Sequence, residues 1–93
     1  MEEAKALAER GDYRGLAQLC LKILGVSSWH EAWARGAQLA ERSKEYVILK
    51  FLASAYVLSS DEIYNVLNEA EREFLARDLA VCIGKVSQLL GLS

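Results

Sequence analysis

The sequence contains no proline and no threonine, and it has only two cysteines and one histidine among its 93 residues. Without proline, the residue that breaks helices most strongly is missing. Two cysteines are too few for the disulfide framework of a small secreted domain. A metal centre needs several histidine, cysteine or carboxylate ligands at short spacing. We find no such cluster, and we expect neither a bound metal nor a cofactor.

Long apolar runs and a strong excess of one charge are also missing. No stretch of about 18 uncharged apolar residues is present, so we expect no membrane span. The net charge is −2, unlike the basic surface of most nucleic-acid-binding proteins. The first residues, Met1 to Lys5, lack the basic-then-apolar order of a signal peptide. We therefore expect a cytoplasmic protein, and the scarcity of methionine, asparagine and glutamine is a thermophile tendency.

The residues that are present favour helices. Hydrophobic residues make up 53% of the chain, above the average of about 45–50%. The strong helix formers alanine, leucine, glutamate, arginine and lysine dominate the composition. We predict an all-α fold in a single domain, residues 1–93, with six helices at 2–10, 12–24, 28–42, 45–58, 61–75 and 78–90. The breaks at 42–45 and 75–78 carry no glycine, and one continuous helix across either is an alternative.

Several helix ends have local signals. Ser28 with Glu31, and Ser59 with Glu62, have the Ser-x-x-Glu spacing of a capping box. Gly25 is placed to end one helix in a left-handed conformation. Gly11 followed by Asp12 predicts the end of one helix and the cap of the next.

The chain is also self-similar at a shift of about 33 residues. At this shift Ala4 aligns with Ala37 and Ala70, and Leu16 aligns with Leu49. Each unit would be a helical hairpin with an acidic residue in its turn. Chance matches in a chain rich in alanine and leucine are the alternative explanation.

The spacing of Gly11-Asp12-Tyr13, Trp33 and Tyr46 resembles the tetratricopeptide repeat. Ala37 stands where that family has a small residue in its first helix, and Tyr46 stands where an aromatic opens the second. The resemblance implies three antiparallel helical hairpins, stacked as repeats, and a closed six-helix bundle is the alternative. The sequence departs from the family at Gly36, which occupies a leucine position.

The second helix of each hairpin is the more apolar one. Only Lys50 and Ser54 interrupt the apolar residues of helix 45–58. A helix that is apolar nearly all round must be buried nearly all round, and three such helices exceed what one small core can cover. We expect the remaining apolar surface to bind a second copy as a homodimer, another protein, or both. Aromatic residues are favoured at such interfaces, and the predicted partner-binding residues are Trp29, Trp33, Phe51, Tyr56 and Tyr64.

No residue pattern indicates an enzyme or a small-molecule substrate. Nucleophilic catalysis needs a serine or cysteine oriented by a base, and the only histidine, His30, has no such neighbour in the sequence. We therefore predict no catalytic residues and a non-enzymatic interaction or assembly subunit. An acidic run contains Glu69, Glu71, Glu73 and Asp78, and we interpret it as a solvated helix face. A surface that receives a basic peptide is the alternative.

The sequence also allows a second function. A small helical subunit or regulator could belong to a nucleic-acid-associated complex although direct binding to nucleic acid is not expected. Its basic residues would be Arg10, Arg14, Lys22, Arg35 and Lys50.

Overall fold

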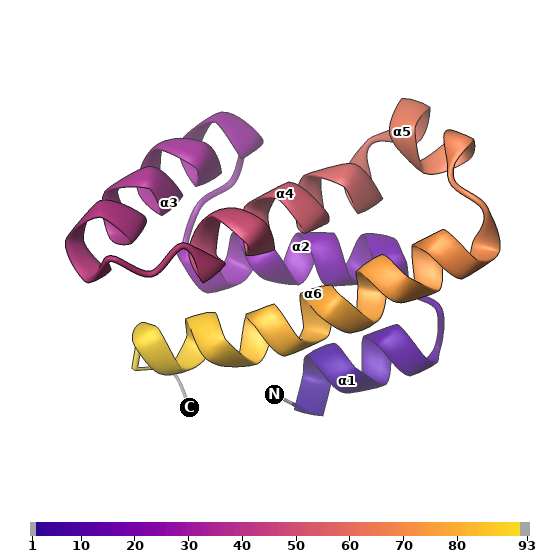
Figure 1. The fold of residues 1–93 in the computed structure, drawn as a ribbon, viewed down its shortest axis with the longest axis horizontal. Coiled ribbons are helices and arrows are strands. Elements are labelled where there is room, and N and C mark those ends of the chain that lie inside the picture. The colour runs from indigo at the N-terminus through magenta and orange to yellow at the C-terminus, as the bar shows by residue number, and fades with distance from the viewer. Residues whose placement is uncertain (1, 92–93) are drawn as a thin grey trace.

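Six α-helices and their short connections form the structure, a computed structural model that describes residues 2–91. The described residues contain no β-strand, which confirms the predicted all-α class. The helices, drawn in Figure 1, are α1 (Glu2–Glu9), α2 (Tyr13–Leu24), α3 (Trp29–Ser43), α4 (Val47–Ser59), α5 (Asp61–Val66) and α6 (Glu69–Leu89). Residues 1, 92 and 93 belong to the predicted domain but lie outside the described residues.

The predicted ends of the first helices are confirmed. Gly11 and Gly25 both have a left-handed backbone, with φ of 75° and 72°. The Asp12 carboxylate accepts a hydrogen bond from the backbone N–H of Gly15 at 3.0 Å and so caps α2. The Ser28 hydroxyl caps α3 by accepting from the backbone N–H of Glu31 at 3.2 Å. The predicted capping box forms only in part, because the Glu31 carboxylate accepts from Ser27 N–H at 3.2 Å rather than from Ser28 N–H. These side chains satisfy N–H groups that have no partner inside their own helix.

The break between α3 and α4 is real although no glycine marks it. Lys44 adopts a left-handed backbone with φ of 60°, and the chain then turns into α4. The two helices are therefore separate, as predicted, and the alternative of one continuous helix is wrong.

The C-terminal third differs from the prediction. The chain breaks after Val66, within the predicted helix 61–75. No break occurs at 75–78, where one helix of 21 residues runs continuously from Glu69 to Leu89, as the alternative for that position had it. Asn68 starts this helix with a complete capping box, in which its side chain accepts from Glu71 N–H at 2.8 Å and the Glu71 carboxylate accepts from Asn68 N–H at 2.9 Å. The capping box predicted at Ser59 and Glu62 does not form.

The helices close into a bundle around α4. This helix packs against α2, α3 and α6, most extensively against α6, and α1 packs on both α2 and α6 (Figure 1). In an open array of repeats each unit contacts only its neighbours, whereas here the first and last helices touch. The third hairpin, 61–75 with 78–90, is also absent. The arrangement is thus the closed six-helix alternative rather than three stacked hairpins.

Candidate functional site

An exposed apolar surface runs along the outside of α3 and α4. Trp33 is 38% exposed, Tyr46 73%, Leu49 37% and Tyr56 41%. Leu49, Ala53 and Tyr56 lie on one stripe of α4, and Tyr46, the residue before the helix, continues the same spacing. Ala37 lies one turn after Trp33 on α3, and it and Ala53 are both exposed. We name this surface the α3–α4 face, which comprises Trp33, Ala37, Tyr46, Leu49, Ala53 and Tyr56.

Three of the five predicted partner-binding residues come together at one end of this face. The ring of Tyr56 meets the ring of Trp29 edge-on, with centroids 5.8 Å apart and an interplanar angle of 88°. The Tyr56 ring also meets the Trp33 ring, with centroids 6.4 Å apart and an interplanar angle of 61°. Such edge-to-face contacts stabilise aromatic pairs beyond simple burial. They tie α3 to α4 and leave rigid aromatic surface exposed.

The prediction for Phe51 is wrong. Phe51 has no exposed surface and belongs to the core, because it faces the helices that α4 packs against rather than solvent. Its side chain therefore cannot contact a partner in this fold.

Tyr64 is placed apart from the other predicted residues. It lies on α5, half-buried, and its ring contacts Tyr13 at 6.5 Å. The guanidinium groups of Arg72 and Arg14 lie 4.2 and 5.7 Å from its ring centroid. These contacts give Tyr64 a structural role in holding α5 to α2 and α6.

Sequence reasoning missed Tyr46 and Leu49 as surface residues. Their spacing from Tyr56 is visible in the sequence, but α4 is apolar on nearly every side, so the pattern alone does not show which stripe faces outward. The nearest charged residue on the helix, Lys50, pairs across to Asp78 of α6 at 3.2 Å. The face itself consists only of uncharged residues.

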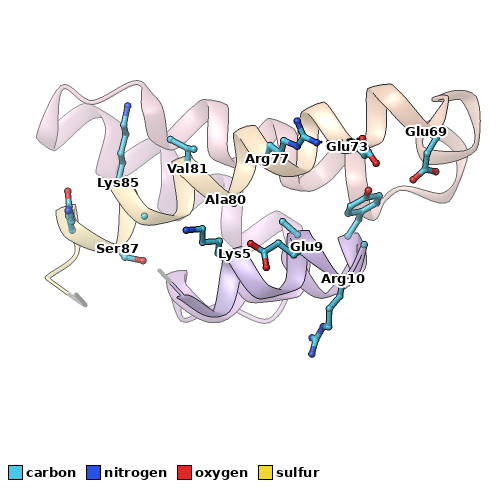
Figure 2. Close-up of a pocket in the computed structure, with 15 residues that line it drawn as sticks. Lys5, Glu9, Arg10, Glu69, Glu73, Arg77, Ala80, Val81, Lys85 and Ser87 are labelled. Carbon is cyan, nitrogen blue, oxygen red and sulfur yellow. Dashed lines mark ion pairs between the residues drawn. The ribbon is translucent and has the colours of Figure 1, made fainter.

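A groove lies between α1 and α6 on another part of the molecule, with a volume of about 980 Å³ (Figure 2). Two members of the acidic run, Glu69 and Glu73, line it. The other two have different roles, because Glu71 completes the capping box of α6 and Asp78 pairs with Lys50. We name this feature the α1–α6 groove.

The two thiols are core groups. Cys20 and Cys82 are both buried and unbonded to each other. Burial raises the pKa of Cys20 and of Cys82, with a smaller contribution from the other thiol for Cys20 and from Asp78 for Cys82. The reactive thiolate form is therefore disfavoured at neutral pH.

Comparison with models of known protein families, with curated proteins and with solved structures finds no match to this chain. Within residues 2–91, no helix combines the length and the apolar character needed to cross a bilayer.

Proposed function

We propose that this protein is a non-enzymatic assembly subunit of the cytoplasm that self-associates through the α3–α4 face. One observation carries the proposal: aromatic and aliphatic side chains of two adjacent helices are exposed together, and the exposed cation beside them, Lys50, is paired with Asp78. Contiguous exposed apolar surface marks interaction sites on globular proteins. Aromatic residues are enriched and charged residues depleted at the centre of such interfaces.

A second copy suits this face for a geometric reason. In a twofold dimer the same surface of each copy forms the interface. If that surface carried charge of one sign, like charges of the two copies would face and repel each other. The α3–α4 face has bulky Trp33 and Tyr56 at one end and small Ala37 and Ala53 beside them. A twofold axis can therefore place the large side chains of one copy over the small residues of the other.

The size of the face predicts a weak dimer. Helix α4 has 13 residues, which corresponds to a length of about 20 Å, and two neighbouring helices are about 20 Å wide. The resulting area, about 400 Å², is half of the ~800 Å² per partner of a standard interface. We expect a dimer that dissociates on dilution. A different protein partner could extend beyond the same face and bind more tightly.

The alternative role in a nucleic-acid-associated complex stays a prediction without a specific observation in its favour. Arg10 pairs with Asp12, Arg14 with Asp61, and Lys50 with Asp78. Three of the five basic residues that would serve this role therefore face a carboxylate within the molecule.

The test is the mass of the protein in solution as a function of concentration. Sedimentation equilibrium from about 1 μM to 1 mM should show a shift from monomer to dimer. Trp33→Ala should move the midpoint of the monomer–dimer transition to a concentration about tenfold higher or more. Tryptophan side chains that become buried in an interface are frequent hot spots. Tyr46→Asp should do the same without harm to the fold, because Tyr46 is 73% exposed at the start of α4.

The matched control is Phe74→Asp, which removes an equally exposed aromatic from α6, outside the face. It should leave the mass profile unchanged. A monomer at every concentration, or a dimer that Tyr46→Asp leaves intact, would overturn the proposal.

A further inference from the structure

Helix α6 is apolar on two opposite sides, and the bundle covers only one of them. On the exposed side, Phe74 is 69% and Val81 59% exposed. A helix that is apolar nearly all round is normally buried nearly all round, whereas α6 packs on α1, α2 and α4 through one side. The buried side carries core residues of this helix: Ala76, Leu79, Ile83 and Val86.

The exposed side of α6 has the spacing of a heptad repeat. Its residues follow one another at alternating steps of four and three positions, and we name this set the α6 seam: Ala70, Phe74, Arg77, Val81, Gly84 and Gln88. With this repeat, the side chains of one helix insert between those of a partner helix over several turns. In an extended strand the side chains alternate every two residues, so a strand cannot follow this spacing. The seam therefore suits a helix.

The α1–α6 groove gives a partner helix room beside the α6 seam. Helix α1 has 8 residues and α6 has 21, which correspond to about 12 and 32 Å, so α1 covers only part of that side of α6. Val81 and Gly84 of the seam also line the groove, as do Ala8 of α1 and Ala80 of α6. Small residues let two helix axes approach closely. A helix on the seam would therefore pack against α6 and along the edge of α1.

The charges around the first half of the seam are already balanced within the molecule. Carboxylates near the start of α6, and the arginine that lines the groove beside them, each have a partner of opposite charge. The pairs are Glu69 with Arg72 at 3.8 Å, Glu73 with Arg77 at 3.8 Å, and Arg10 with Asp12 at 3.9 Å. This end offers no charge that selects a partner.

Two lysines beside the other half of the seam are exposed and unpaired. Neither Lys5 nor Lys85 forms an ion pair with a carboxylate among residues 2–91. Figure 2 shows Lys85 on the side of α6 away from α1, and Lys5 on the α1 side. Glu9, one turn after Lys5 on α1, offsets it only weakly, because lysine before glutamate is the less favourable order at this spacing. A partner that carries acidic side chains on both flanks would complement these two cations.

We propose that the α6 seam binds an amphipathic α-helix of a different protein. Apolar residues of that helix, in heptad spacing, pack on Phe74 and Val81, and acidic residues beside them pair with Lys5 and Lys85. A second copy suits this site less well. Arg77 lies near the middle of the seam, and a twofold axis would bring the two Arg77 side chains close together. The site is separate from the α3–α4 face and does not depend on self-association.

The test uses two fluorescent helical peptides of about three heptads each, with leucine at positions a and d. One has glutamate at positions e and g, and the matched peptide has lysine there, so that like charges keep either peptide from pairing with itself. Fluorescence anisotropy should show the glutamate peptide binding about tenfold tighter than the lysine peptide. The protein has a net charge of −2, so attraction by the whole molecule would favour lysine, and a preference for glutamate reports the local site.

Two variants test the apolar and the charged parts of the site. Phe74→Asp should weaken binding of the glutamate peptide by about tenfold or more without harm to the fold, because Phe74 is 69% exposed. The double variant Lys5→Glu, Lys85→Glu should reverse the preference between the two peptides. The control Lys22→Glu, Lys44→Glu makes the same change of charge at exposed lysines outside the seam and the groove, and should keep the preference for glutamate.

The α3–α4 face provides the last control. Tyr46→Asp should leave peptide binding unchanged, so failure of self-association and failure of this site are distinguishable. Loss of binding in Tyr46→Asp would place the peptide on the α3–α4 face and overturn the proposal. Equal binding of the two peptides, no binding up to about 1 mM, or full affinity in Phe74→Asp would overturn it too. A dimer that Phe74→Asp dissociates would show that a second copy occupies the seam instead.

Discussion

The guanidinium of Arg72 lies 4.2 Å from the centroid of the Tyr64 ring and donates two hydrogen bonds to the backbone carbonyl of Tyr64, at 3.1 and 2.9 Å. This one side chain from α6 thus holds both the ring and the backbone of the six-residue helix α5. At the first residue of α5, Asp61 pairs with Arg14 of α2. A helix this short is not stable alone, and these contacts explain why it forms.

We expect Arg72→Ala to lower the free energy of unfolding by about 2 kcal/mol, because it removes charged hydrogen bonds and a cation–π contact. Arg72→Lys should recover less than half of the loss, since an ammonium lacks the planar fork that reaches one carbonyl twice. Urea denaturation measures both values. Arg77→Ala, at an exposed ion pair, is the control and should change stability by no more than about 0.5 kcal/mol. An equal effect of the two alanine variants would contradict the role of Arg72.

Gly36→Ala should destabilise the protein although alanine is the better helix former. A Cβ at Gly36 would collide with the Leu52 side chain and lie 3.5 Å from Ile48, and both of these are core residues of α4. Overpacking costs about 1–3 kcal/mol, against a gain of about 1 kcal/mol in helix propensity. We expect a net loss of about 1 kcal/mol in thermal or urea unfolding. Leu52→Val in the same chain should reduce the penalty of Gly36→Ala, and simple additivity of the two changes would count against this contact.

Asn68→Ala should cost about 1 kcal/mol, the usual value of a lost N-cap side chain. The matched comparison is Ser60→Ala at the start of α5, where the serine makes no capping hydrogen bond. That change should alter stability by less than about 0.5 kcal/mol. Both values come from urea unfolding. If Ser60→Ala were the more costly variant, the capping role assigned to Asn68 would be contradicted.

Stability should fall in alkaline solution because of the two buried thiols. The folded pKa of Cys20 and Cys82 is raised by burial, so the unfolded chain loses thiol protons at a lower pH than the folded protein does. Their contribution is complete below the unfolded pKa of about 8.5 and declines as the pH rises above it. We expect a lower free energy of unfolding at pH ~9.5 than at pH ~7. The decline should be smaller in the double variant Cys20→Ala, Cys82→Ala, and parallel pH profiles would contradict this origin.

The helix ends illustrate how far local sequence signals reach. Gly11, Gly25 and Ser28 act as predicted because each signal depends only on backbone conformation and on neighbours within one turn. The start of α6 had an equally local signal, Asn68 with Glu71, since asparagine caps as well as serine does. The prediction instead took the serine pair Ser59 and Glu62. At 75–78 it favoured a break and kept a continuous helix as the alternative, because no residue there interrupts a helix.

The candidate surface was only partly predictable. Trp29, Trp33 and Tyr56 meet as aromatic neighbours across α3 and α4, whereas Phe51, five residues before Tyr56 on the same helix, is buried. Both residues lie in a segment that is apolar on nearly all sides. Hydrophobic periodicity cannot show which side of such a helix is buried. Whether Phe51 or Tyr56 faces solvent depends on where α2, α3 and α6 pack against α4.

By itself, the amino-acid sequence determined the helical class, most helix ends and an excess of apolar residues over what a small core needs. These depend on composition and on contacts within a turn. The tertiary structure alone decided that the first and last helices meet to close the bundle, that Gly36 is small because Leu52 lies against it, and which stripe of α4 is left uncovered. Those outcomes depend on contacts between residues distant in the chain, where several packings satisfy the same local preferences.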